Sequence, residues 1–340
     1  MKKILSVLLA VTLCASMCLT GCQKSEKSEK DSKDSGTEKE LVDVKLNEVA
    51  HSIFYAPQYV AIEEGYFTKE GIRLECVTGF GADKTMTAVL SGDADIGFMG
   101  AEASVYAYQE GANDAVVNFT QRAGNFLVAR KEMPDFKWSD LKGKDILGGR
   151  AGGMPEMVFE YILKQNGLDP QKDMNIDQSI DFGSTAAAFS GGQGDFTVEF
   201  EPSATALEKE GAGYVVASCG VDSGYVPYTA YSAKKSFMEK NPEIVQGFVN
   251  ALQKGMDYVN SHSAEEIAKI IKPQFKENDL DTITTIVKRY KDQDTWKDNL
   301  VFEKESFELL QDILDSAGEL KARVDYSNLV VTDYAENAKK

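Results

Sequence analysis

Acidic and hydroxyl side chains alternate with apolar ones in a short segment near the middle of the chain. Thr197, Glu199 and Glu201 occupy every second position there, which predicts a strand that carries all three on one face. A carboxylate at the end of such a strand would accept hydrogen bonds from amino or hydroxyl groups of a ligand, and it would repel a sulfonate or a nitrate. Glu102 follows another predicted strand and points to the same chemistry. The alternative for Glu201, which precedes Pro202, is a purely structural role.

These glutamates favour a ligand with hydrogen-bond donors, such as an aminopyrimidine or another heterocycle. An amine and a sulfonate-type compound stay open as further ligand classes. If Glu199 contacts the ligand, replacing it by alanine weakens binding without unfolding the protein.

A second group of candidate ligand contacts follows the first predicted strand. His51 lies in a turn together with Phe54 and Tyr55. The imidazole either donates to a ligand oxygen or is satisfied within the turn, and the aromatic rings either stack on a planar ligand or belong to the core. Tyr228, at the start of a later strand-like run, is a further candidate. The only other histidine, His262, has no metal-ligand spacing to His51, so we expect no metal and no cofactor.

Glycine-rich or small-residue turns precede four predicted helices. Backbone N–H groups at a helix N-terminus have no partner within the helix and carry partial positive charge, so such turns are candidate contacts for polar ligand atoms. The alternative is ordinary turn chemistry. The turns are Gly81-Ala82, Gly100-Ala101, Gly153-Met154 and Ser184-Thr185.

Strands and helices alternate along most of the chain, which indicates an α/β protein with largely parallel sheets. The order Phe-Gly, helix, Gly-rich turn with Asp, strand, helix, Glu-Gly occurs at residues 80–111 and again at 182–211. In both copies 16 positions separate the aspartate from the final glycine, as at Asp95 and Asp195. The repeat predicts two lobes of similar construction. Further helices are expected at 242–261, 264–271, 280–290 and 304–316.

Several short motifs resemble one family of proteins. They are Ala-Pro-Gln-Tyr-Val-Ala with Gly-Tyr-Phe and Glu-Gly at 56–71, Ser-Gly-Asp-Ala-Asp-Ile-Gly at 91–97, Asp-Leu-Lys-Gly-Lys at 140–144, and Glu201-Pro202. In this order they resemble the type II periplasmic binding proteins that serve sulfonate, taurine, nitrate and thiamine-pyrimidine importers. The resemblance implies two α/β lobes joined by two crossing strands, with 41–125 plus 231–340 as lobe one and 126–230 as lobe two.

The resemblance also implies a function. Such a protein captures a small organic solute by cleft closure and delivers it to an ABC permease and its ATPase; we expect a monomer. Two other classes stay open. One is an enzyme related to thiamine-pyrimidine synthase, which would need a cysteine-rich motif that this chain lacks, and the other is a ligand-sensing receptor of the same fold.

The N-terminus predicts export and a lipid anchor. Two lysines and a short apolar run fit a signal peptide at residues 1–21, and Leu-Thr-Gly-Cys at 19–22 resembles a lipobox, with Cys22 as the lipidated residue. Residues 22–40 are almost entirely polar or charged, which predicts a disordered tether with a reach of roughly 20–25 Å. The expected location is the extracytoplasmic face of the cell membrane.

Charge and cysteine content exclude other classes. The formal net charge of −17 argues against a nucleic-acid partner. Outside the predicted signal peptide and the lipidation site, only Cys76 and Cys219 remain, and neither belongs to a CxxC motif. Two isolated thiols are the expectation for them, with a disulfide as the alternative.

Overall fold

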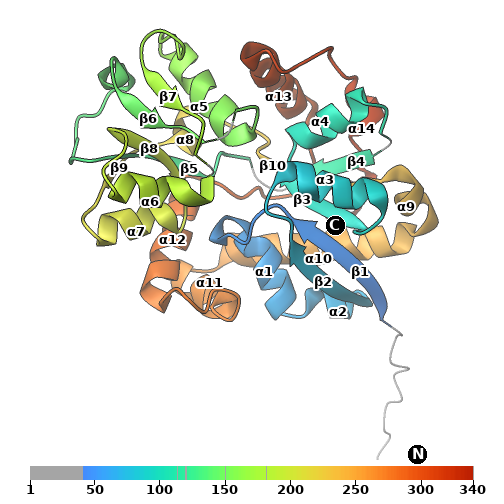
Figure 1. The fold of residues 1–340 in the computed structure, drawn as a ribbon. Coiled ribbons are helices and arrows are strands. Elements are labelled where there is room, and N and C mark those ends of the chain that lie inside the picture. Colours follow the sequence, from blue (N-terminus) through green and yellow to red (C-terminus); the bar gives the residue numbers. More distant parts are fainter. Residues whose placement is uncertain (1–40, 113, 119–120, 150, 181, 340) are drawn as a thin grey trace, which may run out of the picture. The chain divides into compact units, whose positions relative to one another are not determined.

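The strands of the chain form two five-stranded sheets. The computed structural model describes residues 41–112, 114–118, 121–149, 151–180 and 182–339, and both sheets belong to one compact unit. The first sheet contains β1 (Val42–Glu48), β2 (Ile72–Thr78), β3 (Ile96–Gly100), β4 (Asp114–Asn118) and β10 (Thr229–Lys234) (Figure 1). The second contains β5 (Asn125–Ala129), β6 (Asp145–Leu147), β7 (Asn175–Asp177), β8 (Phe196–Phe200) and β9 (Tyr214–Ser218).

The two sheets have the same strand order. It is β2-β1-β3-β10-β4 in the first and β7-β6-β8-β5-β9 in the second. In each sheet the fourth strand of this order runs antiparallel to both its neighbours, while the first three strands are parallel. The mostly parallel α/β fold predicted from the sequence, with two similarly built halves, is therefore confirmed.

The central strands are buried on both faces because helices cover both sides of the sheets. All five residues of β8 are buried or nearly so, and the same holds for β3. Thr197 and Glu199 therefore lie inside the protein rather than on an exposed face.

The helices of the first half follow its strands directly. Among them, α3 packs on β3 and α4 lies beside β4 (Figure 1). They are η1 (Ile53–Tyr55), α1 (Ala56–Glu63), α2 (Tyr66–Lys69), α3 (Ala82–Ser91) and α4 (Glu102–Gln109). Those of the second half are η2 (Trp138–Leu141), α5 (Met154–Gln165), η3 (Phe182–Ser184), α6 (Thr185–Ser190), α7 (Ser203–Lys209) and α8 (Cys219–Asp222).

The chain after β10 is helical and contacts both halves. It forms α9 (Lys235–Lys240), α10 (Pro242–Ser261), α11 (Ala264–Ile271), α12 (Leu280–Asp292), α13 (Lys304–Ala317), α14 (Tyr326–Leu329) and α15 (Asp333–Ala338). The predicted helices of this region are confirmed, with ends that differ by at most two residues. Helix α10 packs on α1 and α13 packs on α5 of the second half. A Cβ atom at Gly255 would lie 2.1 Å from the Pro57 carbonyl oxygen, so only glycine permits this approach of α10 to α1.

Two expectations about the chain as a whole can be compared with the structure. Cys76 and Cys219 are free thiols, Cys219 fully buried, as expected for isolated cysteines. Within the described ranges, no helix combines the length and apolar character that a membrane crossing needs. The predicted signal peptide, Cys22 and the tether lie outside the described residues.

Candidate ligand-binding site

Glu48, the last residue of β1, is the centre of a buried hydrogen-bond network. Its carboxylate accepts hydrogen bonds from Gln58 Nε2 and from the Tyr59 hydroxyl, both at 2.8 Å. The Thr78 hydroxyl donates to it at 3.2 Å. These donors fix the end of β1 against α1 and β2.

The same network accounts for His51. Its Nδ1 lies 2.9 Å from Glu48 Oε1 and its Nε2 lies 3.0 Å from the Gln274 carbonyl oxygen. The ring also stacks on Phe275, with centroids 4.7 Å apart. The hydrogen bond to Glu48 raises the pKa of His51 above its usual value. Both ring nitrogens thus contact protein groups, which agrees with the alternative of a histidine satisfied within its turn.

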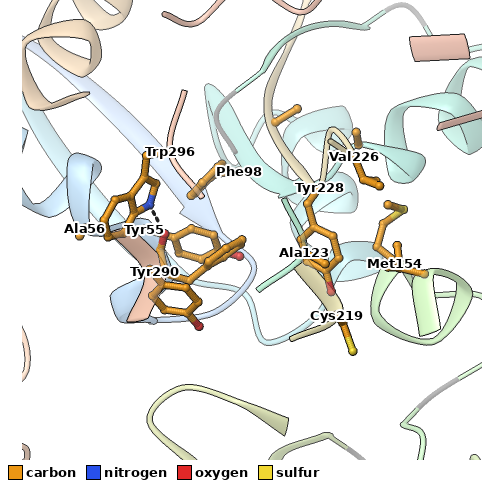
Figure 2. Packing of buried hydrophobic residues seen from close by; sticks show 14 of the residues in the cluster. Tyr55, Ala56, Phe98, Ala123, Met154, Cys219, Val226, Tyr228, Tyr290 and Trp296 are labelled. Carbon is orange, nitrogen blue, oxygen red and sulfur yellow. Dashed lines mark hydrogen bonds between the residues drawn. The ribbon is translucent and has the colours of Figure 1, made fainter. Parts of the chain in front are cut away.

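Phe54, Tyr55 and Tyr228 form a buried aromatic group. The Phe54 ring lies 5.3 Å from Tyr55 and 5.8 Å from Tyr228 between centroids. Tyr55 also packs edge-on against Phe98 at 4.4 Å. Figure 2 shows Tyr228 beside Ala123, with Cys219 and Met154 nearby. The three predicted aromatic residues are therefore brought together by η1 and by the segment that leads into β10.

The hydroxyl of Tyr228 and the side-chain oxygen of Asn125, both in this region, are buried and have no hydrogen-bond partner among the described residues. Tyr228 is 3% exposed and Asn125 is fully buried. Tyr228 immediately precedes β10 and Asn125 is the first residue of β5, so both lie where the chain passes between the sheets. A buried polar group without a partner costs about 1–3 kcal/mol, and a bound ligand is one source of the missing hydrogen bonds.

Glu102 contributes a buried carboxylate to the same region. It is 4% exposed, and its charge helps to raise the pKa values of both Tyr55 and Tyr228, after the larger effect of their burial. A Cβ atom at Gly100 would lie 2.1 Å from Glu102 Oε2. Gly100 is therefore required for the carboxylate to fold back over the end of β3, and Ala101 between them is the N-cap of α4.

A hydrogen bond joins α4 to the turn that precedes α5. The Tyr106 hydroxyl lies 3.4 Å from the Gly152 carbonyl oxygen and 3.6 Å from Met157 Sδ. Glu156 accepts from the Gly152 N–H at 3.1 Å, and its pKa is raised to about 8 by burial and by the neighbouring Glu160. The N-terminus of α5 is thus placed next to the first half of the chain.

The predicted helix N-termini are partly brought together. Ala82 at the start of α3 packs in one apolar cluster with Met99 and Ala103 of the next strand and helix, so Gly81-Ala82 lies close to Gly100-Ala101. Gly153, the N-cap of α5, and the buried Met154 follow the turn that Tyr106 contacts. Thr185 begins α6 and is fully buried.

Glu199 and Glu201 differ in environment. The Thr197 hydroxyl donates to Glu199 at 2.6 Å, and Thr185 also bonds to it. Burial nevertheless raises the pKa of Glu199 to about 7. Glu201 pairs with Arg289 of α12 at 2.5 Å and accepts from both the N–H and the hydroxyl of Thr205 at 2.9 Å. Glu201 therefore has the structural role that was the alternative reading of the sequence.

Sequence reasoning missed Glu48, Asn125, Tyr106 and Glu156. Asn125 left a usable signal, because it is a single polar residue at the start of an apolar strand. The partners of Tyr106 are about 50 positions away in the sequence, and those of Glu48 and Glu156 include near neighbours that form no recognisable motif. In the portion that the structure describes, no group of three or more His, Cys, Asp or Glu side chains is arranged to hold a metal ion.

Two α/β halves of identical strand order, with polar residues gathered where the chain crosses between them, define the fold of the two-lobed periplasmic binding proteins. The chain belongs to the NMT1/THI5 like family, whose model matches residues 53–266. Over 302 residues it is 45% identical to the "Putative binding protein YtlA" of Bacillus subtilis (strain 168), covering 88% of this chain and 90% of that protein.

Solved structures share the fold at lower identity. One is a ligand-binding component of an ABC-type import system from Staphylococcus aureus, solved with zinc bound, at 16% identity and a TM-score of 0.71; the match covers 88% of this chain and 99% of that one. Another is the periplasmic aliphatic sulphonate binding protein SsuA from Escherichia coli, at 17% identity and a TM-score of 0.69, covering 86% and 98%.

Proposed function

We propose that this protein is the extracytoplasmic substrate-binding lipoprotein of an ABC importer, and that it captures a small organic solute bearing hydrogen-bond donors. The observation that carries the proposal is the pair of unpartnered buried oxygens on Tyr228 and Asn125. Both lie on the segments that join the two sheets, where a ligand would contact both halves at once. Family membership and the 45% identical putative binding protein support the general class.

The preference for a donor-bearing solute follows from the acceptor atoms of the described side chains near this region. The side-chain oxygen of Asn125 only accepts hydrogen bonds, and the Glu102 side chain is buried in the same region. A heterocycle with amino groups, such as a pyrimidine, would supply the donors. A sulfonate-type compound is the second candidate, on the ground that the fold is shared with a sulphonate-binding protein.

The proposed mechanism is closure of one half on the other. Without solute the open form would be favoured, and contacts from the solute to Tyr55 and Glu102 of one half and Asn125 of the other would stabilise the closed form. The closed monomer would then dock on the permease, with its ATPase driving transport. The lipid on Cys22 would keep the receptor at the membrane, and neither a cofactor nor a metal takes part.

A thermal-shift screen tests the proposal. Residues 41–340 would be melted with sulfonates, taurine, nitrate, pyrimidines, flavins and amino acids. A solute at a thousandfold excess over its dissociation constant adds about 4 kcal/mol to the free energy of unfolding. Saturable stabilisation by one compound, recovered unchanged after incubation, supports a binding protein. Conversion of that compound would favour the enzyme alternative, and absence of a permease and ATPase from the gene neighbourhood would favour the receptor.

A further inference from the structure

Phe80 combines two unfavourable features in one residue. Its side chain is 78% exposed, against 39–53% for the other large hydrophobic residues that reach the surface of the described structure. Its φ angle is +57°, in the left-handed region that bulky residues rarely occupy. Such an outlier persists where the surrounding structure imposes it, and it is a reason to look for a function.

The backbone on both sides of Phe80 is held firmly. The Gly79 N–H donates to the Glu48 carbonyl oxygen at 2.8 Å, and the Gly81 carbonyl accepts from the Thr85 N–H at 3.0 Å. A Cβ atom at Gly79 would lie 2.4 Å from Asn47 Oδ1 and 2.5 Å from Thr85 Oγ1. The turn is therefore packed directly on the end of β1, and the phenyl ring is presented to solvent by a fixed support.

This turn lies at the same edge of the first sheet as Glu102. Phe80 follows β2, Glu48 ends β1 and Gly100 ends β3, and these three parallel strands are neighbours. Two strand spacings of about 4.8 Å separate β2 from β3. Two residues after Phe80, Ala82 packs in the same apolar cluster as Ala103, the residue that follows Glu102.

We propose that Phe80 covers the solute bound near Glu102, Tyr55 and Tyr228, and that it selects flat, amino-bearing rings by stacking on them. This inference rests on the function proposed above. Contact with the solute would remove the apolar surface of the exposed Phe80 ring from water. A protonated or amino-substituted ring also gains from the negative face of the phenyl group.

Retention of solutes from a cell extract tests the role of Phe80. The full-length chain in detergent would be equilibrated with a deproteinised extract of Bacillus subtilis cells and washed, and the retained small molecules would be identified by mass spectrometry. We expect wild type and F80W to retain the same compound with a flat, amino-bearing ring, and F80A to retain at least tenfold less. V42A is the matched control, because Val42 is an exposed apolar residue (45%) at the opposite end of the same sheet.

A stability measurement separates binding from folding. F80G relieves the left-handed strain, so its solute-free melting temperature should equal or exceed that of wild type while its retention falls. Equal retention by wild type and F80A overturns the role of Phe80 and leaves the proposed function standing. If F80A lowers transport by the assembled importer but leaves retention unchanged, Phe80 contacts the permease; its proposed role in solute binding is then overturned, and the proposed function still stands. A retained compound without a flat ring overturns the stacking, and no retained compound on wild type contradicts the proposed function together with the role of Phe80.

Discussion

Asp95 and Asp195 perform the same task one hundred positions apart. The side chain of Asp95 accepts a hydrogen bond from the Lys45 N–H at 2.9 Å, and that of Asp195 accepts from the Asp145 N–H at 3.1 Å. The backbone N–H of Asp95 also donates to the Lys45 carbonyl at 2.9 Å, and that of Asp195 donates to the Asp145 carbonyl at 2.7 Å. In both sheets the carboxylate thus extends the ladder between two parallel strands by one hydrogen bond beyond the last backbone pair.

Removing these carboxylates should destabilise each half in the same way. D95A leaves the Lys45 N–H without its acceptor and should lower the free energy of unfolding by about 1.5–3 kcal/mol, the range for a hydrogen bond to a charged group. D195A should cost about 1 kcal/mol, because Asp195 is more exposed. Urea denaturation measures both. D93A, in the exposed turn before Asp95, is the control and should change stability by less than about 0.5 kcal/mol; an equal loss in the control would contradict this role.

The ion pair of Arg289 with Glu201 should behave as a buried pair that joins α12 to the second half. R289M leaves Glu201 buried without its cation and should cost about 3 kcal/mol. The double variant R289M/E201Q removes both charges and should recover part of that loss, which a double-mutant cycle in denaturant would measure. K288M removes only the exposed pair with Asp292 and should cost about 0.5 kcal/mol. Strict additivity of R289M and E201Q would show that the pair is not coupled.

These contacts also show which parts of the molecule were predictable from sequence. The two halves could be predicted because Asp95 and Asp195 are each followed by a glycine 16 positions later, within the same order of elements. Helices such as α11 could be predicted because the spacing of apolar residues within a helix can be read from the local sequence. The role of Arg289 was not, since its partner Glu201 is 88 positions away. For His51 the sequence left open a ligand contact or a histidine satisfied within its turn, because the Gln274 carbonyl and the Phe275 ring that contact it come from a distant part of the chain.

The raised pKa of Glu199 predicts a pH-dependent stability. Burial raises its pKa to about 7 from an ordinary value near 4.5, so the folded state holds a proton that the unfolded state loses first. The stabilisation is complete below the unfolded pKa and is lost as pH rises through about 7. Between pH 5 and pH 8, wild type should therefore lose about 2–3 kcal/mol relative to E199Q. Denaturation of both proteins across this range is the measurement.

The comparison with E199Q removes other titrating groups. Glu156 also has a raised pKa, but it is present in both proteins and cancels in the difference. A difference that stays constant with pH would mean that Glu199 titrates as an ordinary glutamate.

The proposed lipid anchor predicts where a cysteine variant is found. In C22S the lipid cannot be attached, so the protein should move from the membrane fraction to the soluble extracytoplasmic fraction and should not incorporate radiolabelled palmitate. C18S changes a cysteine of the predicted signal peptide and should leave labelling and membrane association intact. Incorporation of radiolabelled palmitate into C22S would show that the lipid is attached to another residue.

Y228F separates the cost of an unpartnered hydroxyl from its use in binding. The Tyr228 hydroxyl is buried and finds no partner within the described structure, so its removal should raise the free energy of unfolding of the solute-free protein by about 1 kcal/mol. The same change should weaken the binding of the compound that stabilises the protein in the thermal-shift screen. The expected loss of affinity is at least tenfold, about 1.4 kcal/mol, because the solute loses a hydrogen bond.

The matched control for Y228F is Y290F. The Tyr290 hydroxyl is equally buried but donates to the Gly124 carbonyl at 2.9 Å, so its removal leaves that carbonyl unsatisfied and should lower stability by about 1–2 kcal/mol. Opposite signs for two Tyr→Phe changes in one aromatic cluster would identify Tyr228 as the residue whose hydrogen bond is completed by solute. Destabilisation of the solute-free protein by Y228F would instead show that the hydroxyl is already satisfied within the protein.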